Sequence, residues 1–252
     1  MIAAIRSENL KYKRSFAKKL AIFAPLFFAL YGAIMQIYLP EGAKPSWETF
    51  VSLVFNWWPL FFMPLGTALL CALSDNRERK SGGYRNLRVH PVSPHRLWYG
   101  KIMVLALYTL LSSVALIIIV LLTGSLTASG AIPYVDIVKA ALLIWFVSLS
   151  LIPIQLFVAT WKGMVTSMAL GIFGMLAGVL MAAQTAWYAL PWSWALRLMC
   201  PVIGVHPNGV RLTAGDPLLD TSVIATGMLT SIVAFAILSW ITAIWFSKRE
   251  VR

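Results

Sequence analysis

Few side chains in this chain of 252 residues have the type and spacing that catalysis or metal binding requires. The histidines, His90, His95 and His206, form neither an HExxH motif nor a cluster, so zinc binding and acid–base catalysis are not indicated. Cys71 and Cys200 fit neither a CxxC nor a zinc-ligand spacing. We predict a buried thiol at Cys71, an unpaired one at Cys200, and no catalytic or metal site.

Energy conversion within the chain is not indicated either. No GxxxxGK[ST] motif occurs, so the chain lacks that type of ATP site. The long apolar stretches lack Asp, Glu, Lys and Arg in their cores, whereas ion-coupled carriers and proton pumps usually place an ionisable group at membrane depth. We expect Gln155, which lies in such a stretch, to make an interhelical hydrogen bond.

The most polar part of the chain is the segment from Asp75 to Lys101, which is set between two apolar stretches. It has seven basic residues and two acidic ones, Asp75 and Glu78. Ser81-Gly82-Gly83 predicts a break, Tyr84 to Val89 a short helix, and Ser93-Pro94 the capped start of a further helix. We interpret the segment as a cytoplasmic coupling loop that docks a soluble, energy-supplying partner. Binding of the loop to anionic lipid headgroups is the alternative.

The elements that position this segment follow from composition. The chain is 60% hydrophobic and 12% charged with a mean hydropathy of +0.79, which a soluble surface does not allow. We predict an all-α, polytopic membrane protein that forms a single transmembrane domain over residues 1–252. Its length suits about six spans, expected near residues 21–39, 50–73, 102–122, 135–160, 164–183 and 221–246.

Two further segments have helical patterns of their own. Residues 1–20 predict a basic amphipathic helix in the headgroup layer. Residues 184–219 are rich in Trp and Pro and predict an extracellular re-entrant or interfacial helical hairpin, because Trp prefers the membrane interface. Within the fifth span, the small residues Gly174, Gly178 and Ala182 favour close helix packing or a subunit interface.

The charge distribution predicts the orientation. The net charge is +12, and 17 of the 21 basic residues fall in the N-terminal helix, the 75–101 segment, the turn at 161–163 and the C-terminal tail. By the positive-inside rule both termini are cytoplasmic. Topology thus explains the charge, and no nucleic-acid partner is needed.

Short motifs give this pattern a family resemblance. The opening ENLKYKRS at residues 8–15 is similar to that of lantibiotic-immunity permeases of the MutE/EpiE type, within the type-2 ABC exporter permeases. The polar segment is similar to the same group at Glu78, Gly82, Arg85-Asn86-Leu87, Pro91-Val92-Ser93 and Lys101.

The resemblance implies a permease of the bacterial cytoplasmic membrane without its own ATPase activity. Its partners would be two copies of a cytoplasmic ABC ATPase, which bind ATP and Mg, and a second permease, often a different six-span homologue. Docking would involve a set of residues of the coupling loop and its start: Glu78, Arg79, Tyr84, Arg85 and Leu87.

The implied cargo is a cationic, lantibiotic-like antimicrobial peptide removed from the membrane. Trp187, Trp192 and Trp194 are candidates for contact with it, although interfacial anchoring explains these tryptophans about as well. Another cargo, such as a different peptide antibiotic or a lipid, remains open. So does a non-transporting scaffold or sensor role, whereas a membrane-embedded enzyme would need a reactive cluster that is not visible.

Overall fold

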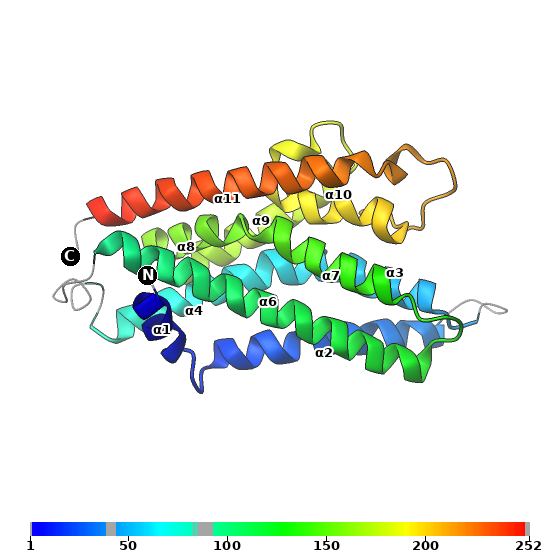
Figure 1. Cartoon of the computed structure of the whole chain (residues 1–252), viewed down its shortest axis with the longest axis horizontal. Helices are drawn as coiled ribbons and strands as arrows, with labels where there is room; N and C mark the ends of the chain where they lie inside the picture. Colours follow the sequence, from blue (N-terminus) through cyan, green and yellow to red (C-terminus); the bar gives the residue numbers. More distant parts are fainter. Residues whose placement is uncertain (1, 39–43, 83, 85–92, 250–252) are drawn as a thin grey trace.

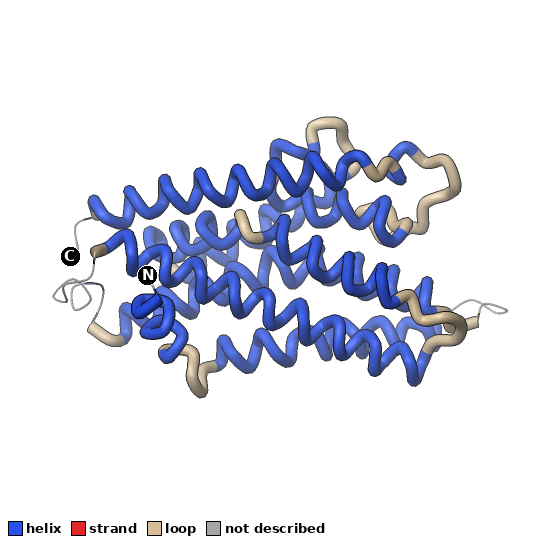
Figure 2. Tube along the Cα trace, in the orientation of Figure 1, coloured by secondary structure: helices blue, strands red, loops and turns tan. Residues whose placement is uncertain are grey.

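The structure is a computed structural model that describes residues 2–38, 44–82, 84 and 93–249. The expected short helix over 84–89 lies outside the described residues except for Tyr84. The described residues form helices without a regular strand, so the predicted all-α fold class is confirmed (Figure 2).

The spans lie side by side along the long axis of the molecule (Figure 1). Among the described residues, five helical segments are long and apolar enough to cross a membrane, and a bent pair makes a sixth. These segments are α2 (Phe16–Met35) with η1 (Gln36–Tyr38); α3 (Trp47–Trp57), η2 (Trp58–Gly66) and α4 (Thr67–Lys80) in succession; α6 (Pro94–Thr127); the pair α7 (Tyr134–Ser148) and α8 (Leu151–Lys162); α9 (Met164–Ala182); and α11 (Ser222–Lys248).

One end of the bundle collects the basic segments. It holds α1 (Ile2–Leu10), the two helix ends that flank the 81–93 connection, the α8–α9 turn and the end of α11 (Figure 1). We call it the basic end. The sequence expectation that these four segments share one side of the bundle agrees with this arrangement.

The N-terminal segment differs from the expectation of one helix over residues 1–20. Helix α1 stops at Leu10, Arg14 has a positive φ of 61°, and Ser15 caps a new helix by accepting a hydrogen bond from Lys18 N at 3.3 Å. A left-handed residue cannot continue an α-helix, so the amphipathic pattern is divided between α1 and the first turn of α2. The prediction of a single helix was wrong.

Prolines account for the irregular spans. Pro153 lacks an N–H and its ring clashes with the carbonyl of the residue four positions earlier, Leu149. The helix breaks there, and α7 and α8 meet at 44°. In the second span, the segment η2 contains Pro59 and Pro64 and widens into a π-helix.

The segment 184–219 contains one substantial helix, not a hairpin of two. After the short turn η3 (Trp187–Ala189), helix α10 (Pro191–Ile203) starts with proline at its first position and is buried throughout from Trp192 to Cys200. It packs mainly against α9 and α7. The turn η4 (Pro217–Leu219) then precedes α11.

Candidate functional site at the basic end

The last turns of α4 carry the charged residues around which the basic end is built. Asp75 and Glu78 are buried, and Arg79 is half exposed. The helix continues this far because Arg77, Arg79 and Lys80 lie in its last turn, where positive charge is favourable beside the exposed carbonyls. Five charged residues on adjacent turns thus lie directly before the 81–93 connection.

Glu78 belongs to a ring of four charges, Glu8, Lys11, Glu78 and Lys101, which we call the charge ring. Lys101 Nζ lies 2.7 Å from Glu78 Oε1 and 3.1 Å from Glu8 Oε2. Lys11 Nζ lies 2.7 Å from Glu78 Oε1 and 2.6 Å from Glu8 Oε1. Each lysine therefore bridges both carboxylates, and the signs alternate around the ring.

Burial makes this ring sensitive to any missing member. The side chain of Lys101 is fully buried and those of both glutamates nearly so, whereas Lys11 is about one quarter exposed. Burial lowers the pKa of Lys11, but the nearby carboxylates of Glu8 and Glu78 outweigh it and raise the pKa overall. Two positive and two negative charges balance, so removal of one would leave an uncompensated buried charge.

Asp75 and Arg79 form a second cluster that reaches the neighbouring helices α8 and α11. Arg79 Nε donates to Asp75 Oδ2 at 2.6 Å, and Arg79 Nη2 donates to the carbonyl of Thr160 at 2.9 Å. The same carbonyl accepts from Arg249 Nη1 at 2.8 Å. The end of α8 is thereby held by guanidinium groups from α4 and from the end of α11.

Tyr84, which belongs to the 81–93 connection, is bonded to this second cluster. Its hydroxyl donates to Asp75 Oδ1 at 2.8 Å, and its ring packs edge-on against Phe246 with the centroids 5.3 Å apart. Burial first, and then the charge of Asp75, raise the pKa of Tyr84 well above its usual value. The phenol therefore stays protonated at neutral pH and serves as a hydrogen-bond donor.

Aromatic contacts hold the N-terminal segment on the same surface. Tyr12 is buried and stacks on Tyr108 of α6 with the ring centroids 4.4 Å apart, and the guanidinium of Arg77 lies 4.3 Å from the centre of the Tyr12 ring. Tyr108 also donates to Asn9 Oδ1 at 3.1 Å. The result is that α1 and its following turn are fixed to both α4 and α6.

The candidate docking residues therefore occupy different environments. Glu78 and Tyr84 face inward and are bonded within the chain, whereas the half-exposed Arg79 lies at the edge of the Asp75 cluster. Arg85 and Leu87 lie outside the described residues.

Sequence reasoning missed the charge ring as a unit, although Glu8, Lys11, Glu78 and Lys101 all belong to the motifs quoted above. The available signal was a glutamate and a lysine placed where apolar spans begin or end, since such groups need partners when buried.

The candidate tryptophans lie far along the chain, on η3 and α10, and all three are buried. Trp194 Nε1 donates to the carbonyl of Tyr188 at 3.0 Å. The ring of Trp192 lies over Gly174 of α9. Their surfaces are thus used for packing within the chain.

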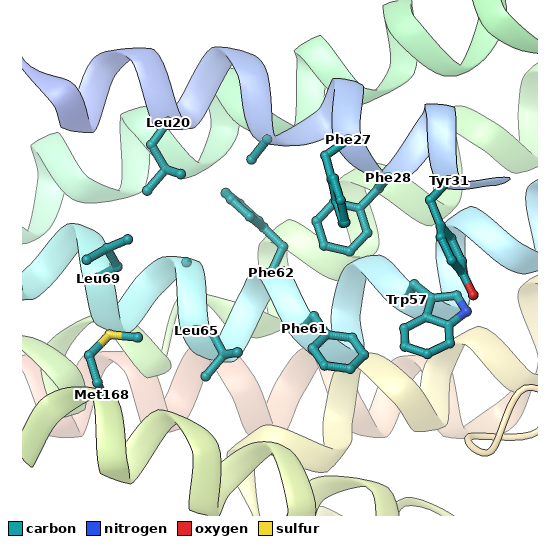
Figure 3. A pocket seen from close by; sticks show the side chains of 12 residues that line it. Leu20, Phe27, Phe28, Tyr31, Trp57, Phe61, Phe62, Leu65, Leu69 and Met168 are labelled. Carbon is teal, nitrogen blue, oxygen red and sulfur yellow. The ribbon is translucent and has the colours of Figure 1, made fainter. Parts of the chain in front are cut away.

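An apolar groove of about 530 Å³ lies between α2 and the second span (Figure 3). Aromatic rings from both sides line it, and Met168 of α9 lies at one end. Its lining includes Phe27, Phe28 and Tyr31 of α2 and Trp57, Phe61 and Phe62 of the second span. The lining residues are aromatic or aliphatic and none carries a carboxylate or an amine, so the groove suits hydrocarbon.

Together these features define a polytopic helical membrane protein with two clusters of charged side chains at one end and an apolar groove between its spans. The family model described as ABC-2 family transporter protein matches residues 4–178, which is well over half of the chain. The chain belongs to this family and is a membrane-embedded permease subunit of an ABC transporter, which works with an ABC ATPase. Neither the curated proteins nor the solved structures gave a match.

Proposed function

We propose that the chain is the permease of an ABC exporter whose partner ATPase docks at the basic end, on the 81–93 connection. The observation that supports this most is the arrangement of α4. Its last turns are bonded to the N-terminal segment and α6 through Glu78, and to α8 through Arg79. A displacement of this helix end would be transmitted through these contacts to the N-terminal segment, α6 and α8. Coupling of a permease to an ATPase requires such transmission.

The proposed orientation places the basic end in the cytoplasm of a bacterial cell, with both termini inside. The positive-inside bias of 17 out of 21 basic residues supports it. In this orientation the 81–93 connection faces the compartment that contains ATP and Mg. Two ATPase copies would serve this chain and a second permease.

Direct ATPase contacts are proposed for Arg79, Arg85 and Leu87. Glu78 and Tyr84 are also expected as contacts, but they are bonded to Lys101 and Asp75 within the chain. We propose that they hold the docking surface in place without contacting the ATPase. An apolar anchor such as Leu87 would supply affinity, and the flanking arginines would supply register.

Co-purification tests the docking proposal. The chain carries an affinity tag and is co-expressed with its cognate ABC ATPase in membranes solubilised in mild detergent. We expect the ATPase to be retained by the wild-type chain and lost on Leu87→Asp, because a charge would be buried in the interface. Leu126→Asp, at an 88% exposed site at the far end of α6, is the matched control. Equal retention by both variants would contradict docking at this connection.

For the cargo, we propose a cationic, amphipathic lantibiotic-like peptide, on the strength of the sequence motifs. Peptide contact at Trp187, Trp192 or Trp194 would require α10 to move, because all three are buried. Sensitivity of cells to the peptide in Trp192→Ala and Trp194→Ala variants, at matched expression, tests this. Unchanged protection would refute direct contact.

The apolar groove favours a lipid as the second candidate cargo. Its lining residues carry no carboxylate that would pair with a cationic side chain, whereas their aromatic and aliphatic side chains suit an acyl chain. ATP-dependent movement of a fluorescent lipid in vesicles containing the complex, without protection against peptide, would decide for this candidate.

A further inference from the structure

The charge ring joins three separate parts of the chain at one point. Glu78 is two residues before the end of α4, Lys101 follows the start of α6 by seven residues, and Glu8 lies on α1. Glu78 and Lys101 therefore occupy the two stems of the 81–93 connection. Glu8 and Lys11 belong to the N-terminal segment, which approaches these stems from elsewhere in the chain.

Stability alone is a weak reason for such a ring. Desolvation of buried charges offsets much of their attraction, and apolar side chains of similar volume often stabilise a protein as well or better. What a charge ring adds is dependence on geometry. Each lysine bridges both carboxylates at 2.6–3.1 Å. A relative shift of the N-terminal segment against the stems therefore breaks two contacts together, Lys11 with Glu78 and Lys101 with Glu8.

We propose that the charge ring is a latch that fixes α1 to both stems, so that α1 moves with them when the ATPase acts on the 81–93 connection. The proposal rests on the proposed function. Glu8 and Lys11 are then positioning residues for coupling, although they lie outside the docking surface. In this proposal the N-terminal helix α1 takes part in the conformational change that the ATPase causes, and does not serve only to hold the chain at the membrane.

The ring can be opened on the α1 side alone. Glu8→Gln with Lys11→Gln removes one negative and one positive charge and leaves the 2.7 Å pair between Glu78 and Lys101 in place. The stems and the docking surface are thus untouched, and no unbalanced buried charge is created. Glu48→Gln, which breaks an exposed ion pair with Arg211, is the matched control.

A covalent substitute for the latch is available beside the ring. A Cβ atom built at Gly100 of α6 would lie 3.4 Å from the Cβ of Ala4 on α1, close to the separation found in disulfides. Ala4→Cys with Gly100→Cys would therefore tie α1 to α6 under oxidising conditions and release it under reductant. The native Cys71 and Cys200 are buried and are replaced by alanine in every protein of the series, including the reference.

The experiment measures two quantities in lipid vesicles: retention of the cognate ATPase, and the permease-dependent part of its ATP hydrolysis. For Glu8→Gln/Lys11→Gln we expect retention to stay within about twofold and permease-dependent hydrolysis to fall about tenfold, a typical size for lost coupling. Oxidation of the Ala4→Cys/Gly100→Cys pair in this background should restore hydrolysis, and reductant should abolish it again.

Two results would overturn the latch. One is normal permease-dependent hydrolysis in Glu8→Gln/Lys11→Gln, and the other is low hydrolysis although the cross-link has formed. Failure of the proposed function looks different: the reference chain itself would neither retain the ATPase nor change its rate.

Discussion

The indole of Trp192 occupies the space that a side chain would need at Gly174. A Cβ at Gly174 would lie 2.3 Å from ring atoms of Trp192, and a Cβ at Gly178 would meet the Trp192 backbone at 2.7 Å. The small-residue face of α9 is thus filled by α10 of the same chain, and a subunit interface is not needed to explain it.

Gly174→Ala should therefore destabilise the fold. Contact at this distance forces Trp192 or the α9 backbone to move, and overpacking of this kind costs about 1–3 kcal/mol. Thermal unfolding in detergent measures it. Leu176→Ala, at a 57% exposed position of the same helix, serves as the control; equal melting temperatures for both variants would contradict the packing.

Lys101→Gln should lower the free energy of unfolding by about 3–5 kcal/mol, more than Gly174→Ala, because it leaves two buried carboxylates facing one lysine. Adding Glu78→Gln restores the charge balance and should recover part of the loss. The free energy of unfolding of the single and double variants, measured together, checks this. If the double variant is as unstable as the sum of both single changes, the two residues are not coupled.

Tyr84→Phe should lower stability by about 1.5–3 kcal/mol, the range for a hydrogen bond to a charged group. The change keeps the ring against Phe246 and removes only the donor to Asp75, 2.8 Å away. Unfolding in detergent measures the loss. Tyr134→Phe, at an exposed position, should have no effect; a Tyr84→Phe variant as stable as this control would exclude the bond.

Alkaline pH should destabilise the basic end. The pKa values of Lys11 and Tyr84 are both raised in the folded state above ordinary values of 10.5 and 10.0. The unfolded chain then releases these protons first, so the stabilisation is complete below about pH 10 and is lost as the pH rises further. In the chain with Cys71 and Cys200 replaced by alanine, so that no thiol titrates in this range, the melting temperature should be flat between pH 7 and 9 and fall above pH 10. A fall that begins below pH 9 would contradict this assignment.

Much of the architecture could be predicted because the bilayer constrains it. Each of the six expected spans overlaps a helical segment, although Trp47–Lys80 and Pro94–Thr127 extend well beyond the expected bounds of 50–73 and 102–122. The Ser93 cap at the start of α6 and the hydrogen bond of Gln155 with Ser167 are confirmed. Apolar length and capping are local properties, so a single sequence displays them. The break at Arg14 was missed because no glycine or proline marks it.

The site could be predicted only in part. The importance of the 75–101 segment follows from its charge, but the direction in which Glu78 points depends on Lys11 and Lys101, which come from two other elements. Burial of Trp187, Trp192 and Trp194 likewise depends on how α10 packs on α9 and α7. Such long-range contacts leave no signature in the spacing of one chain.

The helical segments on either side of the 81–93 connection, Trp47–Lys80 and Pro94–Thr127, each contain 34 residues. At 1.5 Å per residue the α-helical segment Pro94–Thr127 is about 51 Å long, whereas a bilayer with its headgroups is roughly 40–45 Å thick. Trp47–Lys80 is somewhat shorter, because its π-helical part η2 rises less per residue. At the end of the bundle away from the 81–93 connection, the two segments lie side by side. Ser46 forms an isolated β-bridge with Ser129 there, and the ring of Trp47 packs against Gly124. Each segment is thus longer than the roughly 20 residues that cross the hydrocarbon core, so we expect the charged last turns of α4 and the first turns of α6 to lie outside that core.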